Sequence, residues 1–177
     1  MWRDAIARRP ANARAHGNLG MALAREGDFE HAKRSLSESL RIDPSNPQAH
    51  NFLGVMLDHE GLADDAIAHY RAALAFKPSY GEAHSNLGAL LIERGQLQEA
   101  MTHLTEGVRL RPNDAVAQNN LGILLARQGR VQEAIARFSE ALRINPQNVD
   151  AKDNVKRALA VQQQARAPAA SPGGTGD

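Results

Sequence analysis

Apolar residues recur along the chain with the spacing of an amphipathic helix, and polar, glycine-containing segments separate them. In the first full block, Leu19 and Leu23 lie four residues apart, so both fall on one face of a helix. Gly27 follows the block, and glycine can end a helix in the left-handed conformation that other residues avoid. The pattern predicts a helix from about residue 13 to residue 26.

A second helix is predicted directly after this turn, over about residues 29–42. Ala32, Leu36 and Leu40 lie four apart and share a face. Pro44 then ends the helix, because proline cannot continue the hydrogen-bond ladder. The two segments together predict an antiparallel helix hairpin.

The hairpin pattern returns every 34 residues, which composition alone cannot produce. Its proline column is Pro10, Pro44, Pro78, Pro112 and Pro146, and its alanine column is Ala32, Ala66, Ala100 and Ala134. Residues 13–146 are therefore expected to hold four units, at 13–46, 47–80, 81–114 and 115–148.

Small residues in these columns have a packing reason. Gly20 and Ala32 lack bulk where the two helices of a hairpin must approach closely, so a larger side chain there would overpack. Gly107 stands where other second helices have Ala73 and Ala141, and its lower helix propensity is expected to weaken the third unit by up to about 1 kcal/mol.

The residues that carry this pattern resemble the tetratricopeptide repeat (TPR). Leu-Gly-x2-Leu, then Ala-x3-(Leu/Tyr/Phe), then Pro at a period of 34 covers about Met1 to Leu159. The resemblance implies an all-α fold, a TPR solenoid of stacked antiparallel helix hairpins in a right-handed superhelix. The chain departs from the family where Trp is favoured, since those places hold His16, His50, His84 and Gln118.

The register also predicts the ends of the array. Trp2 shares its register with Tyr70 and Phe138, so residues 1–12 are expected to form a half-repeat, the second helix of a preceding unit. Either this half-repeat caps the array, or the chain is a piece of a longer repeat protein.

At the other end, residues 147–161 are expected to form a capping helix. Val155 and Lys156 replace the Leu-Gly pair there, and a charged residue in place of glycine indicates that no second helix packs on it. Residues 162–177 are predicted by composition to be a disordered tail.

Composition excludes several functions. The chain has 177 residues, no cysteine, 21 Lys+Arg against 20 Asp+Glu, and 4% aromatic residues. A nucleic-acid binder usually carries a basic excess and stacking aromatics, so no nucleic-acid partner is expected. The lack of cysteine removes thiol nucleophiles and Cys-ligated zinc, and it fits a reducing compartment without excluding an oxidising one. No apolar run is long enough to insert directly into a membrane.

Histidine is the remaining candidate for metal or acid–base chemistry. His16, His50 and His84 occur once per repeat, but stacked helices stand about 8–10 Å apart, too far for three such side chains to close one tetrahedral site. His69 and His103 show no ligand spacing in the sequence. We therefore expect no metal, no cofactor and no catalytic site, and predict that the chain is not an enzyme.

Polar residues along one face of each first helix are the candidate binding residues. In the TPR family this face lines a concave groove, so the resemblance implies that a partner peptide or helix binds there. An asparagine amide both donates and accepts hydrogen bonds, and a column of amides can hold an extended peptide backbone. The alternative is that these amides are merely solvated or bond between neighbouring helices. The candidate residues are Asn18, Arg25, Asn51, Phe52, Asn86, Asn119, Asn120 and Arg127.

Three further functions remain to be weighed. A carboxylate clamp of the kind some TPR proteins use is not expected, because Glu82 would repel the ligand. The asparagine column and the run Ala83–Gly88 resemble the TPR arms of O-linked N-acetylglucosamine transferases, which implies a substrate-recruiting segment whose catalytic domain lies outside this chain. Self-association through an open N-terminal face near Trp2 is the third alternative.

Overall fold

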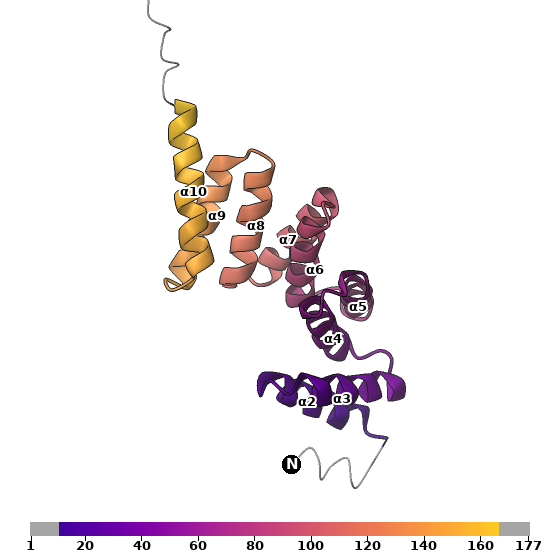
Figure 1. The fold of residues 1–177 in the computed structure, drawn as a ribbon. Helices are drawn as coiled ribbons and strands as arrows, with labels where there is room; N and C mark the ends of the chain where they lie inside the picture. Colours follow the sequence, from indigo (N-terminus) through magenta and orange to yellow (C-terminus); the bar gives the residue numbers. More distant parts are fainter. Residues whose placement is uncertain (1–10, 167–177) are drawn as a thin grey trace, which may run out of the picture. The chain divides into compact units, whose positions relative to one another are not determined.

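The structure, a computed structural model, describes residues 11–166, and this part of the chain forms nine helices and no strand (Figure 1). Contacts divide the chain into two compact units, residues 1–113 and 114–177. The all-α prediction is confirmed. The helices of the first unit are α2 (Ala13–Arg25), α3 (Phe29–Ile42), α4 (Pro47–His59), α5 (Ala63–Phe76), α6 (Gly81–Glu93) and α7 (Leu97–Leu110), and those of the second are α8 (Ala115–Arg127), α9 (Val131–Ile144) and α10 (Val149–Arg166).

The turn inside each hairpin is set by a glycine in the left-handed conformation. Gly27 has φ +83°, and the residue after it, Asp28, donates its N–H to the Leu23 carbonyl at 3.0 Å, which closes the end of α2. The Asp28 carboxylate then accepts the N–H of His31 at 3.3 Å and caps α3. Gly61, Gly95 and Gly129 repeat the positive φ. The expected helix stop at Gly27 is confirmed.

The two helices of a hairpin approach so closely that a β-carbon does not fit at the glycine column. A Cβ on Gly20 would lie 2.6 Å from Leu36 Cγ, and one on Gly54 would lie 2.6 Å from Tyr70 Cε1. Such distances are shorter than a normal carbon–carbon contact of about 3.5–4.0 Å. The alanine column faces the same contact, and Ala32 and Ala66 are completely buried. The predicted close approach is therefore present.

Gly107 is explained by the side chain that faces it. A Cβ at this position would lie 2.5 Å from Ser85 Oγ, so the glycine leaves room for a serine on α6. The first hairpin reverses the pair, because a Cβ on Gly17 would lie 3.1 Å from Ser39 Oγ. Each hairpin thus combines a small residue with a larger polar one at this level. Glycine at position 107 lowers helix propensity, as predicted, but it also permits the close contact with Ser85. An alanine there would force one of the two residues to move.

The last helix continues beyond the predicted boundary. α10 extends to Arg166, so the expected start of a disordered tail at 162 is wrong for residues 162–166. Glutamine and alanine are good helix formers, and the first helix-breaking residue after them is Pro168. Residues 1–10 and 167–177 lie outside the described residues, and with them Trp2, the predicted half-repeat and the rest of the predicted tail.

In each of two hairpins, a pair of histidines joins the first helix to the second. Nδ1 of His50 lies 2.9 Å from Nδ1 of His69, and Nδ1 of His84 lies 2.9 Å from Nδ1 of His103. Nε2 of His50 lies 3.1 Å from the Pro44 carbonyl, which can only accept. Nε2 of His50 therefore carries the proton, so its Nδ1 accepts from His69. Both pairs span 19 residues, a hairpin spacing that sequence inspection missed.

The surroundings of the second histidine in each pair favour its neutral form. Burial, and then the facing histidine, lowers the pKa of His69 and of His103. Asp65 raises the pKa of His69, and Glu99 raises that of His103 while Arg71 lowers it, but the lowering effects dominate. In the fourth hairpin the same two places hold glutamine and arginine.

We expect Ala66→Leu and Gly88→Leu to lower the melting temperature, because each would force added carbons into the helix contact. Overpacking of this kind costs about 1–3 kcal/mol. Ala68→Leu, on the exposed side of the same helix as Ala66, is the matched control. Thermal unfolding followed by circular dichroism tests this, and melting of Ala66→Leu at the temperature of the Ala68→Leu control would contradict the assignment.

Acid is expected to destabilise the chain through the histidine pairs. A histidine with a lowered pKa takes up its proton more readily in the unfolded chain, so its contribution to stability is present above a pH of about 6.5 and is lost as the pH falls below that value. Between a pH of about 7.5 and 5.5, we expect the free energy of unfolding to fall less in the double variant His69→Gln/His103→Gln than in the wild type. Urea unfolding at both pH values measures it; an unchanged decrease would show that these residues do not titrate on unfolding.

Candidate functional site

The candidate site is a face formed by neighbouring first helices. These are the first helices of the hairpins, α2, α4, α6 and α8, together with α10, which continues the same register. α2 lies against α4 and α4 against α6 in the first unit, while α8 lies against α10 in the second. The 34-residue repeat brings equivalent side chains of these helices next to one another.

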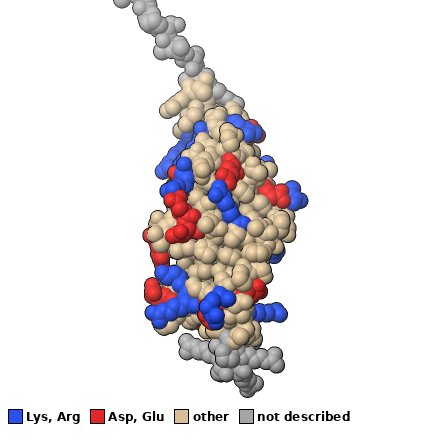
Figure 2. Space-filling model, turned by 90° about the vertical axis from the view of Figure 1, so that its right-hand side faces the viewer, with Lys and Arg blue, Asp and Glu red and all other residues tan. Residues whose placement is uncertain are grey.

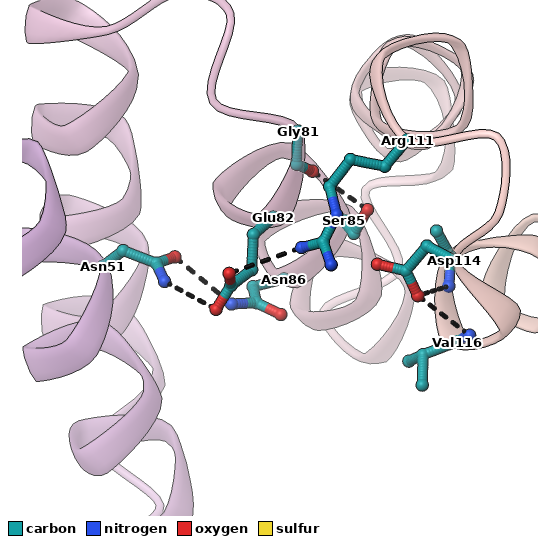
Figure 3. Close-up of polar contacts among 9 residues, drawn as sticks. Asn51, Gly81, Glu82, Ser85, Asn86, Arg111, Asp114 and Val116 are labelled. Carbon is teal, nitrogen blue, oxygen red and sulfur yellow. Dashed lines mark hydrogen bonds and ion pairs between the residues drawn. The ribbon is translucent and has the colours of Figure 1, made fainter. Parts of the chain in front are cut away.

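Asn51 is the centre of a hydrogen-bonded cluster between α4 and α6 (Figure 3). Its side chain is completely buried; its Nδ2 donates to Glu82 Oε1 at 3.1 Å, and its Oδ1 accepts from Asn86 Nδ2 at 3.2 Å. Arg111 Nη1 donates to the other Glu82 oxygen at 3.3 Å. Asn51, one of the predicted site residues, thus points toward α6 and is not accessible from solvent.

The second unit repeats the same bond. Asn154 Nδ2 on α10 donates to Asn119 Oδ1 on α8 at 3.1 Å, and Asn119 is buried to 6% exposure. Asn119 therefore joins two helices and, like Asn51, is buried between them. Asn154 was not among the predicted site residues, although it follows Asn120 by one 34-residue period and so belongs to the same column.

The asparagine column itself lies one residue further along each first helix than Asn51 and Asn119. Its members are half-exposed: Asn18 on α2, Asn86 on α6 and Asn120 on α8. Within the described part of the chain, Asn18 and Asn120 have no hydrogen-bond partner. The amide nitrogen of Asn86 has two hydrogens and uses one on Asn51, so one N–H and the carbonyl oxygen stay available. These side chains can each both donate to and accept from a bound chain.

Phe52 interrupts the column, and an apolar pocket of about 510 Å³ opens beside it. The pocket lies between the C-terminal halves of α2 and α4. Phe29, which is 54% exposed, forms part of its wall at the start of α3. Arg25 lines the pocket, as does Glu60, whose carboxylate accepts from Lys33 Nζ at 2.6 Å. The site therefore combines an apolar cavity with the guanidinium of a predicted site residue.

The second unit also has a pocket, of about 320 Å³, between α8, the start of α9, and α10. Arg127, a predicted site residue, lines it together with Asn154 and Arg157. Asn120, in contrast, lies outside both pockets. The predicted residues thus divide into helix-joining asparagines, accessible asparagines and pocket residues.

Burial affects the acid–base groups next to the face. Burial and then Glu82 raise the pKa of Tyr80 to about 12, and a hydrogen bond with Asn51 opposes this. Burial also raises the pKa of Asp58, with His59 partly offsetting it.

The charged surface is mixed in sign. Figure 2 shows Lys and Arg side chains next to Asp and Glu over much of the viewed face. Several of these are arginine–glutamate pairs three residues apart on one helix, such as Arg41 with Glu38 and Arg109 with Glu106. Among residues 11–166, no helix is both long and apolar enough to cross a membrane, and no group of three or more potential metal ligands comes together.

Comparisons with known proteins agree with this architecture. The model of the tetratricopeptide repeat matches residues 1–47, 18–81 and 85–149. No curated protein matches the sequence.

Solved structures show the same fold. YrrB, described as a TPR protein with an unusual peptide-binding site, has 24% identity and a TM-score of 0.76, over 92% of this chain and 84% of YrrB. PilF of Pseudomonas aeruginosa has 28% identity and a TM-score of 0.75, over 89% of this chain and 72% of PilF. PilW, described as a type IV pilus biogenesis factor, has 26% identity and a TM-score of 0.75, over 86% of this chain and 70% of PilW.

The family model matches most of the sequence that forms the helix hairpins and carries their 34-residue period. The chain belongs to the tetratricopeptide repeat family.

Proposed function

We propose that this chain is a protein-interaction scaffold and that an extended segment of a partner protein binds along the face of its first helices. Family membership supports the general role, since TPR arrays bind other proteins. The expected concave groove would be lined by this face. The site residues left exposed to a partner are Asn18, Arg25, Phe52, Asn86, Asn120 and Arg127.

The observation that carries this proposal is the arrangement of the asparagine column. Asn86 and Asn154 are held by their bonds to a buried asparagine on the preceding first helix, yet each amide keeps one N–H and one oxygen. The carbonyl of an extended peptide backbone can accept from the amide N–H, and its N–H can donate to the amide oxygen. An amide that is already oriented loses less side-chain entropy when it binds. The helix-joining role and the binding role are therefore compatible.

A second candidate function is favoured by the same column. Asn18, Asn86 and Asn120 resemble the asparagines of TPR arms that recruit substrates for glycosyltransferases. Under this function the chain would hold a substrate for a catalytic domain outside it. Peptide binding to the isolated chain is expected under both functions and does not distinguish them. Transferase activity in the isolated chain would contradict both functions.

Selection from a displayed library of random peptides provides the test. We expect peptides enriched on the wild-type chain to bind Asn18→Ala/Asn86→Ala/Asn120→Ala about tenfold or more weakly, because three hydrogen bonds of about 1 kcal/mol each are removed. Fluorescence anisotropy of the labelled peptides measures the affinity, and circular dichroism verifies the fold of the variant.

The matched control removes three exposed hydroxyls on second helices, in Ser37→Ala/Thr105→Ala/Ser139→Ala. This control should bind like the wild type. Equal affinity of the asparagine triple variant and the wild type would show that the enriched peptides do not use the proposed face.

A further inference from the structure

The two apolar pockets occupy equivalent places in the repeat. Ala24, Arg25 and Phe29 of the first pocket correspond, three 34-residue periods later, to Ala126, Arg127 and Val131 of the second. Met56 likewise corresponds to Ala158. The same cavity therefore forms in both units where the end of a first helix, the start of its second helix and the next first helix meet.

The walls of these pockets suit an apolar side chain. Phe29, Phe52, Val55 and Met56 supply most of the first pocket, and Met56 is itself part of the buried core of α2, α3 and α4. Phe29 is more than half exposed, so its ring forms an accessible part of the pocket wall. The volume of about 510 Å³ lies in the range of pockets that bind ligand groups.

The charges at the pockets are positive. In the first, Glu60 is paired with Lys33 at 2.6 Å, and within the described residues Arg25 has no carboxylate partner. In the second, Arg127 and Arg157 line the cavity and no carboxylate does. A bound group is therefore favoured if it carries negative charge next to its apolar part.

Resting on the proposed function, we propose that the pocket of the first unit receives an apolar side chain of a partner segment, and that an adjacent Asp or Glu of that segment binds Arg25; the pocket of the second unit, taken by itself, offers an equivalent apolar cavity. In the first unit the anchor enters where Phe52 replaces the asparagine of the column. The partner is thus an acidic segment with large apolar residues, held by amides along its backbone and by the pocket at one of its side chains. Residues 167–177 of this chain contain no large apolar residue that could supply the anchor.

Peptide selection with pocket variants tests this. We expect peptides enriched on the wild-type chain to place Phe, Leu, Ile or Met next to Asp or Glu. Phe52→Asn installs the residue that Asn18, Asn86 and Asn120 hold in this register, so it should fold while weakening these peptides about tenfold. Arg25→Glu should weaken them by a similar factor, and a new selection on this variant should recover Lys or Arg beside the apolar residue.

The control is Arg34→Glu, which makes the same charge change at an exposed position of α3 outside the pocket. If Arg34→Glu and Arg25→Glu weaken peptide binding equally, the effect comes from the overall charge of the chain, and the pocket assignment is overturned. Peptides that are sensitive to the asparagine triple variant but not to Phe52→Asn or Arg25→Glu would leave the proposed function standing and overturn the pocket. A selection that enriches no peptide would count against both.

A second copy of the chain is the competing occupant. Sedimentation at several concentrations decides it: a dimer in the wild type that Phe52→Asn dissociates would place another copy of this chain in the pocket and overturn the proposed partner. A wild-type chain that stays monomeric while it binds the acidic peptides is the expected result.

Discussion

The close approach of the two helices within each hairpin is the contact on which the rest of the structure depends. Gly20 leaves no space for a β-carbon against Leu36, and Gly54 leaves none against the ring of Tyr70. Because protein interiors are packed at nearly crystalline density, such a contact fixes the separation and the rotation of the paired helices together. Repetition of the contact every 34 residues turns a local sequence pattern into a repeated three-dimensional unit.

Once the hairpins are fixed, the remaining side chains of the first helices have definite neighbours. Asn51 is directed into the contact with α6, where it is completely buried and must be hydrogen-bonded, since an unpaired buried amide would be costly. The bond to Asn86 meets that requirement and also orients an amide that remains accessible. A packing constraint and a candidate binding surface thus share the same residues, and neither excludes the other.

The candidate site could be predicted from the sequence only in part. The column that contains Asn18, Asn86 and Asn120 follows from the repeat, as does the departure at Phe52. Burial of Asn51 and Asn119 did not follow, because a helical face about 100° wide contains both residues that touch the next helix and residues that touch solvent. The pockets did not follow either, since each is built from three helices and their walls depend on which side chains leave space.

The sequence by itself determined the hairpin helices, the turns between them and the family, because glycine and proline act within a few positions of the chain and recur with a fixed period. The tertiary structure decided the partners across the hairpins. It showed that Gly107 makes room for Ser85, that His50 and His69 share a hydrogen bond, and that Arg25 and Arg127 stand at equivalent apolar cavities. These contacts join residues on different helices, and their distances depend on how the helices pack rather than on how the residues are spaced along the chain.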